Sequence, residues 1–291
     1  MRATPPVVRL LACLLGAGTL SACQEETAPP PVDVIEYVAL GDSHTAAPHK
    51  PEDDLEIPCG RSRTNYPRVL KTLLGRTLLT DVSCSGADTT KATEGWEWRG
   101  IPVPSQLDAL SADTDLVTVN LGGNDEGLFL AWYEGCQPLT PIDPKGSPCA
   151  DANRSRDGDA LLDKVPRIQR NVRTFLDEVT DRAPNAAVVL VTYPRAFPDR
   201  GTCELASAFA RGDHAYINSV IKAVSDGLIA AAEDAGVGWV DVYGASQGHD
   251  VCSEEPWTNG VTDDWTRANE LHPFPEEQAA VAQMIFDMIN R

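Results

Sequence analysis

The chain has 291 residues, of which 42% are hydrophobic and 23% are charged, so it is long enough for one large or two small globular domains. Its 24 Lys and Arg residues against 43 Asp and Glu residues give a net charge of −19. Binding to nucleic acid and electrostatic adsorption to anionic lipid both need cationic patches, so this balance argues against both. The acidity is spread along the whole chain, which indicates a soluble surface rather than a site.

Residues 1–22 have the pattern of an export signal. Arg2 and Arg9 supply a positive region, and the apolar core from Val7 to Leu20 is shorter than a confident membrane span. We therefore expect this segment to be a processing signal and not an element of the fold.

The signal ends in Leu20-Ser21-Ala22-Cys23, which resembles a bacterial lipobox, after which Cys23 becomes the lipid-bearing first residue. An ordinary signal peptide with a chance cysteine is the alternative. Acyl chains on Cys23 would hold the protein to a membrane surface. Residues 23–32 contain three consecutive prolines and no apolar pattern, so they are expected to form a stiff tether.

Five apolar runs predict the strands of one parallel sheet, and helical periodicity predicts the segments between them. In chain order the expected strands are Ile35–Leu40, Leu78–Val82, Leu116–Leu121, Ala186–Tyr193 and Val237–Tyr243. The expected helices are 66–74, 106–110, 126–133, 159–182, 213–235 and 275–289. Strands that alternate with helices indicate that residues 33–291 form a single doubly wound α/β domain.

Four stretches are expected to be irregular because they are rich in Pro, Gly or Asp. They are Thr45–Arg63, the segment around Trp96 and Trp98, an insertion at Glu134–Asp157 and the loop Gly244–Leu271. A loop as long as this insertion is usually functional or held by a cross-link. Its two cysteines, Cys136 and Cys149, offer a local disulfide.

Cysteine usage agrees with export. Of the eight cysteines, one lies in the signal and one is the lipid site, which leaves Cys59, Cys84, Cys136, Cys149, Cys203 and Cys252. An even set in an exported chain favours three disulfides, although six cysteines allow fifteen pairings. A zinc site is the competing interpretation, but no cysteine pair has ligand spacing.

Three of the predicted strands end in small, polar sequences that expose the backbone. The first runs into Gly41-Asp42-Ser43, the second is followed by Ser85-Gly86, and the third by Gly123-Asn124-Asp125. Because parallel strands place their carboxyl ends on one side of a sheet, these segments should meet there. A fourth segment, Leu271-His272-Pro273, enters the last helix and could reach the same rim.

These residue types fit acyl transfer, which needs a nucleophile, a base within hydrogen-bond reach and donors directed at the developing oxyanion. Ser43 fits the first role and His272 the second. The backbone N–H groups of Ser43 and Gly86, with the side-chain amide of Asn124, fit the third. The alternative for the first segment is that Asp42 and Ser43 only cap the next helix.

The four segments resemble, in order and rough position, the four blocks of the SGNH (GDSL) hydrolase superfamily. The resemblance covers nearly the whole chain after the signal and is closest to secreted actinobacterial esterases and lipases, on the segments Cys59-Gly60-Arg61-Ser62, Asp81–Ala87 and Leu116–Asp125. It implies a three-layer, flavodoxin-like α/β/α fold and an ester-cleaving Ser43–His272 pair, with the oxyanion held by Ser43, Gly86 and Asn124. It also implies three disulfides, which would pair Cys59 with Cys84, Cys136 with Cys149 and Cys203 with Cys252.

One position departs from the family pattern. The family's acid usually lies three residues before the histidine, where this chain has Asn269, and an amide carries no charge to stabilise an imidazolium. Some relatives use a backbone carbonyl instead, and the carbonyl of Asn269 is the candidate here. The adjacent Glu270 and, less favoured, Asp263 and Asp264 are the carboxylates in the same loop.

The other histidines have structural interpretations. His44 follows the nucleophile and is expected to point away from it as an exposed polar residue, and His49 and His214 are expected at the surface. His249, near Cys252 and Trp257, is the only rival base. Four tryptophans fall in loops around the predicted rim, where packing is the default and acyl-chain contact a hypothesis; they are Trp96, Trp98, Trp257 and Trp265.

Together these features predict a cell-surface serine esterase or lipase that uses no cofactor and no metal. We expect a monomer that acts on small-molecule or lipid esters, does not bind nucleic acid, and is lipid-anchored at Cys23 or released as a secreted form. Within the same fold a carbohydrate deacetylase or phospholipase is possible. The alternatives from other classes are a lipid-anchored binding protein that has lost the chemistry, and a metallohydrolase, which the missing ligand cluster disfavours.

Overall fold

The computed structural model describes residues 34–49, 51, 53, 59–98, 100–261 and 264–291. The described residues all belong to one compact unit, residues 31–291. The predicted signal peptide (1–22) and tether (23–32) lie outside the described residues.

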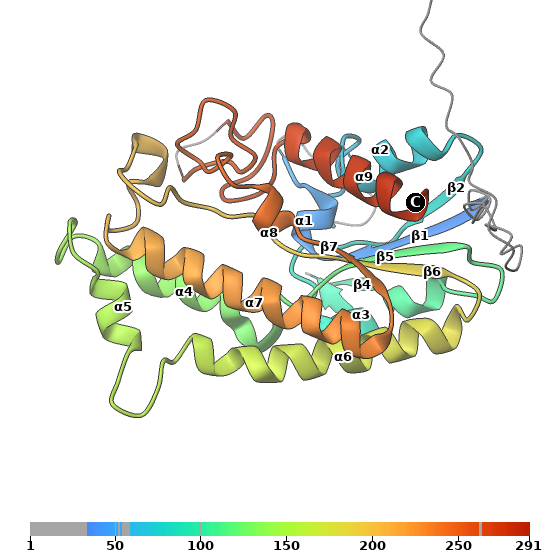
Figure 1. Cartoon of the computed structure of the whole chain (residues 1–291), viewed down its shortest axis with the longest axis horizontal. Coiled ribbons are helices and arrows are strands. Elements are labelled where there is room, and N and C mark those ends of the chain that lie inside the picture. The colour runs from blue at the N-terminus through green and yellow to red at the C-terminus, as the bar shows by residue number, and fades with distance from the viewer. Residues whose placement is uncertain (1–33, 50, 52, 54–58, 99, 262–263) are drawn as a thin grey trace, which may run out of the picture. The chain divides into compact units, whose positions relative to one another are not determined.

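A five-stranded parallel sheet forms the centre of this unit, as predicted (Figure 1). Its spatial order is β2-β1-β5-β6-β7. The strands are β1 (Glu36–Gly41), β2 (Leu78–Asp81), β5 (Leu116–Asn120), β6 (Ala187–Val191) and β7 (Gly238–Val240). All five residues of β5 are buried, including Thr118 and Asn120. The neighbouring strand β6 reads Ala-Val-Val-Leu-Val, a continuous apolar run that is typical of a parallel strand covered on both faces.

Helices cover both faces of the sheet, which gives the predicted three layers. In Figure 1, α2 (Tyr66–Leu74) and α9 (Pro275–Ile289) lie above the sheet, and α6 (Val165–Arg182) and α7 (Asp213–Ala235) lie below it. The shorter helices are α1 (Ser43–Ala46), α3 (Thr89–Glu94), α4 (Leu128–Cys136), α5 (Pro148–Asn153) and α8 (Val242–Ala245).

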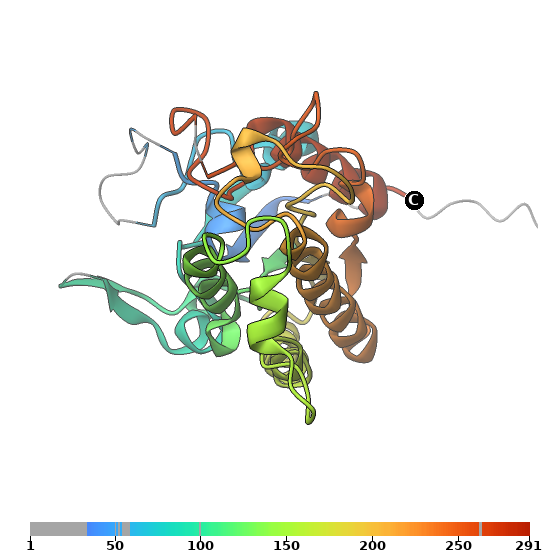
Figure 2. The same ribbon diagram turned by 90° about the vertical axis from the view of Figure 1, so that its left-hand side faces the viewer.

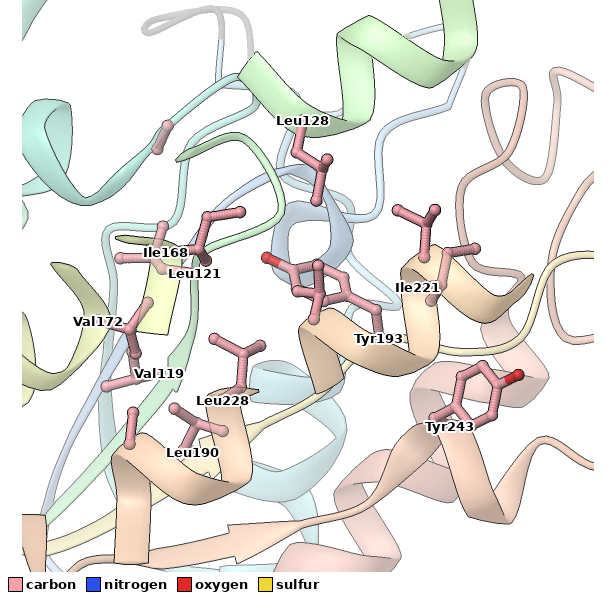
Figure 3. Packing of buried hydrophobic residues seen from close by; sticks show 14 of the residues in the cluster. Val119, Leu121, Leu128, Ile168, Val172, Leu190, Tyr193, Ile221, Leu228 and Tyr243 are labelled. Atoms are coloured by element: carbon pink, nitrogen blue, oxygen red, sulfur yellow. The ribbon is translucent and has the colours of Figure 1, made fainter. Parts of the chain in front are cut away.

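Each face of the sheet has its own apolar core. On one face Tyr37, Val189 and Val191 of the sheet pack with Leu70 of α2 and Ile285 of α9. On the other face a larger cluster joins alternate residues of β5 and β6 to α6 and α7 (Figure 3). Burial of these side chains, at about 25 cal/mol per Å² of apolar surface, drives the layers together.

The helix ends follow the local sequence. Asn65 caps α2 through a bond from the Arg68 N–H to its Oδ1, and Pro67 occupies the first turn, where its missing N–H is tolerated. Gly236 ends α7 in the left-handed conformation, with φ +69°. The boundaries of α2, α7 and α9 agree with the sequence-based prediction.

Several segments differ from the prediction; Thr89–Glu94, for example, forms α3, which the sequence did not predict. The segment around Trp96 and Trp98 is not irregular: β3 (Trp96–Trp98) pairs antiparallel with β4 (Ile101–Val103), and the two strands extend to the left in Figure 2. The fifth strand ends at Val240 because Asp241 caps α8, accepting the Gly244 N–H at 2.9 Å. The long helix begins at Val165 rather than 159, because Asp159 caps the preceding turn, accepting from Leu161 and Leu162 at 3.1 Å each.

Three disulfides pair the six cysteines as the family resemblance implied: Cys59–Cys84, Cys136–Cys149 and Cys203–Cys252. The second closes the predicted insertion, which also contains α5. The cross-linked residues are 13 to 49 positions apart, and loop entropy of this size is worth about 3 to 4 kcal/mol per bridge. Disulfides persist in oxidising compartments, so they indicate an exported protein.

Among the described residues, no helix has the length and apolar character needed to span a membrane.

Candidate active site

Ser43 lies at the sharp turn where β1 gives way to α1. Asp42 caps α1 by accepting the His44 N–H at 2.8 Å. Gln106 fixes the last residue of the strand, accepting the Gly41 N–H at 2.8 Å and donating to the Gly41 carbonyl at 2.9 Å. A Cβ at Gly41 would lie 2.0 Å from Thr45 Oγ1, so only glycine allows the helix to fold back so closely. The turn presents Ser43 at the carboxyl end of β1, as predicted.

The proposed oxyanion donors follow the two strands on either side of β1. Gly86 comes after β2 and adopts φ +80°, a conformation that favours glycine. Asn124 comes after β5, and its Nδ2 donates to the Ala87 carbonyl at 2.9 Å. This bond ties the Asn124 loop to the residue next to Gly86, so the two donor segments are held together.

His272 reaches the same end of the sheet from the loop before α9. Its backbone carbonyl accepts the Asn259 N–H at 2.9 Å, and Pro273 pairs with Thr258 in an antiparallel bridge. Within the ring, Nδ1 lies 2.6 Å from the backbone carbonyl of Glu270. A carbonyl accepts only, so this contact places the proton on Nδ1 and leaves Nε2 as the acceptor.

The carbonyl that holds His272 therefore belongs to Glu270, and the prediction of Asn269 is wrong. The Asn269 carbonyl instead accepts the backbone N–H of His272 at 3.1 Å. The cause is Leu271, whose φ of +54° turns the chain so that the carbonyl two residues before the histidine faces the ring. A non-glycine residue in this region is uncommon and carries strain.

No carboxylate among the described residues bonds to the His272 ring. The Glu270 carboxylate accepts the hydroxyl of Tyr133 on α4. The carboxylate of Asp264 accepts the backbone N–H of Thr266 at 3.2 Å, and Asp263 lies outside the described residues. The histidine is thus oriented by a peptide carbonyl rather than by an acid.

Ser43, Asn124 and His272 all line one cavity of about 480 Å³. Gly86 does not line this cavity. The next residue, Ala87, is hydrogen-bonded to Asn124, which does. No hydrogen bond joins the Ser43 hydroxyl to His272 in the part of the chain that the structure describes. Such bonds often form only once substrate is bound.

The rest of the cavity wall is largely apolar and aromatic. Trp265 and Leu130 are exposed at 46% and 56%, while Trp132, Ile221 and Ala196 are buried. Besides these five residues, Ser43, His44, Asn124 and the segment Asn269–His272, the cavity is lined by Phe129, Tyr133, Tyr193, Pro194 and Thr258. Apolar walls with a few polar groups are typical of sites for small organic ligands.

His44 was expected to be exposed and to point away, and this is wrong. Its ring lines the cavity, packing edge-on against Tyr193 at 4.9 Å and tilted against Phe129 at 5.9 Å. Burial, with a smaller effect from nearby His272, holds the pKa of His44 well below its usual range. His44 is therefore a neutral wall residue at neutral pH.

The remaining histidines lie elsewhere. His249 stacks on Trp257 with ring centroids 4.6 Å apart, and its Nδ1 contacts the Glu255 carbonyl. It does not line the cavity, so it is not a rival base. His49 pairs with Asp53. His214 is buried rather than at the surface, because its ring stacks on Phe197 at the start of α7.

Two buried carboxyl groups support the site from behind. Burial raises the pKa of Asp42 to about 7, although bonds from Tyr193 and the His44 N–H oppose the shift. Asp125 accepts from the Thr89 N–H and hydroxyl and from Asn171, and burial raises its pKa as well. Neither side chain lines the cavity.

The described residues contain no group of three His, Cys, Asp or Glu side chains placed to hold a metal ion.

Sequence reasoning missed several residues of this site, chiefly Tyr133, Tyr193 and the apolar residues of α4. Tyr193 carried a usable signal, since it follows the carboxyl end of a predicted strand, where the other site residues also lie. Tyr133 and Trp132 carried none, because they precede an insertion whose path the sequence does not specify.

The chain matches the model of the GDSL-like lipase/acylhydrolase family over residues 39–279. It is 36% identical over 269 residues to Lipase 2 of Streptomyces coelicolor, covering 90% of this chain and 86% of that protein. It is 30% identical over 287 residues to an esterase of Streptomyces scabiei, covering 86% and 81% respectively.

Among solved structures, phospholipase A1 from Streptomyces albidoflavus NA297 superposes with a TM-score of 0.72 at 24% identity, covering 89% of this chain and 100% of that one. This likeness shows a shared fold. The family match spans most of the chain and includes every residue proposed for the site. The chain therefore belongs to the GDSL-like lipase/acylhydrolase family and is a carboxylic ester hydrolase.

Proposed function

We propose that this chain cleaves carboxylic esters through a covalent acyl-enzyme, with Ser43 as nucleophile and His272 as general base. The observation that carries the proposal is that Ser43, Asn124 and His272, which come from three distant segments, line one apolar cavity. The names of the Streptomyces coelicolor lipase and the Streptomyces scabiei esterase support the reaction class.

In the first half-reaction Ser43 Oγ attacks the ester carbonyl carbon while His272 Nε2 takes the hydroxyl proton. The carbonyl oxygen becomes an oxyanion that accepts from the Ser43 and Gly86 N–H groups and from Asn124 Nδ2. As the intermediate collapses, the bond to the alcohol oxygen breaks and that oxygen receives the proton from His272. Water then attacks the acyl-serine by the same steps in reverse, which frees the carboxylic acid and restores Ser43.

The Glu270 carbonyl takes the orienting part of the role that an acid usually fills. By accepting Nδ1–H at 2.6 Å it fixes the ring and its tautomer. It also carries a partial negative charge that favours the imidazolium, as a carboxylate does more strongly. A working base therefore requires no acid at position 269.

The acyl chain of the substrate is expected to lie against the apolar wall of the cavity. Trp132, Ile221 and Ala196 form its buried part, and Leu130 and Trp265 its exposed rim. The polar groups cluster where the ester would sit, next to Ser43.

Replacing Ser43 with Ala should reduce turnover of 4-nitrophenyl butyrate by at least about 10⁴-fold, because removal of the nucleophile leaves only binding and oxyanion stabilisation. The matched control is Ser111→Ala, which removes an exposed hydroxyl far along the chain, and it should retain wild-type rates. Turnover that survives Ser43→Ala would refute the assignment.

Fluorophosphonate labelling separates this enzyme from a binding protein that kept only the fold. The wild-type chain should be labelled at Ser43 and the Ser43→Ala chain should not. An unlabelled wild-type chain that still binds lipid would favour the binding protein.

The pH dependence of kcat/KM should report the base. Burial lowers the pKa of His272 below its ordinary value of 6.5, with the Glu270 carbonyl opposing the shift. The active form is neutral, so activity is lost only as the pH falls through this lowered pKa, and the acidic limb should have its midpoint below pH 6.5. The midpoint of this limb should be unchanged in Asp42→Asn, which removes a buried carboxyl group whose pKa burial raises to about 7. A midpoint above 6.5, or one that moves with Asp42, would contradict the assignment.

We also propose that the enzyme works at the cell envelope, tethered by lipid on Cys23 through residues 23–32. The lipobox-like sequence and the disulfides support this location. Expressed with its signal, the wild-type chain should fractionate with membranes and partition into the detergent phase of Triton X-114. The Cys23→Ser chain should be found in the soluble fraction. A Cys23→Ser chain that remains with membranes would overturn the anchor.

A further inference from the structure

The buried hydroxyl of Tyr193 links the loop that carries Ser43 to the loop that carries Asn124. Tyr193 follows β6 and is 1% exposed. Its hydroxyl donates to Asp42 Oδ2 at 2.6 Å and accepts the Gly123 N–H at 2.8 Å. Figure 3 shows its ring within the core cluster near Leu128 and Ile221, with the hydroxyl directed towards the blue α1 segment.

We propose that Tyr193 is a positioning residue whose hydroxyl sets the placement of Asn124 relative to Ser43. The proposal rests on the proposed function, because it assigns Asn124 to the oxyanion. The partners of the hydroxyl are the residues immediately before the two reacting positions: Asp42 precedes Ser43, and Gly123 precedes Asn124.

The sheet alone does not fix this placement. Hydrogen bonds between β1 and β5 pair the strands as far as Gly41 and Asn120. Asn124 lies four residues past the last paired position of β5, outside this ladder. The Tyr193 hydroxyl links the two loops beyond the paired residues. Tyr193 itself lies just after β6, the strand that pairs with β5.

Both partners depend on this hydroxyl. Asp42 is fully buried, and its other oxygen, Oδ1, is occupied by the His44 N–H. Among the described residues the Gly123 N–H has no other acceptor. A Cβ at Gly123 would lie 2.4 Å from the Phe129 ring, so this peptide is held close to the aromatic wall. Removal of the hydroxyl leaves a buried acceptor and a buried donor unpaired, and the two loops must shift to find new partners.

The ring of Tyr193 has a second, separable role. It packs edge-on against His44 at 4.9 Å and Phe129 at 4.8 Å and lines the cavity. Phenylalanine preserves this wall and removes only the hydroxyl, so substrate binding and oxyanion placement are affected separately.

Tyr193→Phe should lower kcat for 4-nitrophenyl butyrate by about 10- to 100-fold, since a misplacement of about 1 Å in a catalytic group has an effect of this size. KM should stay within about twofold of wild type, because the apolar wall is intact. Active-site titration from the 4-nitrophenol burst counts only the folded enzyme, which separates loss of fold from loss of rate.

The matched control is Tyr37→Phe. The Tyr37 side chain is also buried and its hydroxyl is also hydrogen-bonded, to Thr118 at 2.8 Å, but it packs on the opposite face of the sheet, away from the cavity. Both variants should lose stability in urea unfolding, and only Tyr193→Phe should lose kcat. Equal kcat in the two variants would assign Tyr193 a purely structural role and overturn the proposal.

A double-mutant cycle tests the route through Asn124. If the hydroxyl acts by placing this amide, the factor by which Asn124→Ala lowers kcat should be at least about threefold smaller in the Tyr193→Phe background than in wild type. Fully independent effects would contradict the route. Ser43→Ala is measured in the same series: turnover that survives it defeats the proposed function, whereas its loss together with a normal Tyr193→Phe defeats this inference alone.

Discussion

The parallel pairing of β1 with β2 and β5 is the constraint on which the site depends. It brings Gly41, Asp81 and Asn120 to the same edge of the sheet, so the loops that follow these strands must meet. Catalysis by a serine hydroxyl needs donors and a nucleophile held within a few tenths of an ångström, and two packed helical layers provide that rigidity. The side-chain links at this edge, from Gln106 to Gly41 and from Asn124 to Ala87, extend the order of the sheet into the loops.

The proposed base is held by different means. His272 lies in a loop outside the sheet, and a strained residue, Leu271, turns the Glu270 carbonyl onto the ring. Glu270 also anchors the loop through its side chain, because its carboxylate accepts the hydroxyl of Tyr133 on α4. One residue thus fixes the ring through its backbone and the loop through its side chain. Strain of about 1 to 3 kcal/mol at Leu271 is offset by these contacts.

Sequence patterns predicted the parts of the fold that depend on local chemistry. Predominantly apolar segments located the five strands, and the polar sequences after three of them placed Ser43, Gly86 and Asn124 at the carboxyl edge of the sheet. The patterns failed where tertiary contacts decide. Nothing in the identity of Leu271 indicates a positive φ, so the orienting carbonyl was assigned to Asn269 instead of Glu270. The sequence predicts His44 and His214 at the surface, and this is wrong because aromatic residues elsewhere in the chain pack against their rings. The residues next to each histidine do not reveal these contacts.

The most direct test of the account is a crystal structure of the enzyme inhibited by a butyl phosphonate, whose tetrahedral phosphorus mimics the acyl-transfer intermediate. The account predicts phosphorus bonded to Ser43 Oγ and the phosphoryl oxygen at about 2.7–3.1 Å from the N–H groups of Ser43 and Gly86 and from Asn124 Nδ2. It also predicts His272 Nε2 within hydrogen-bond reach of Ser43 Oγ. An adduct on another residue, or a phosphoryl oxygen directed away from Gly86 and Asn124, would contradict it.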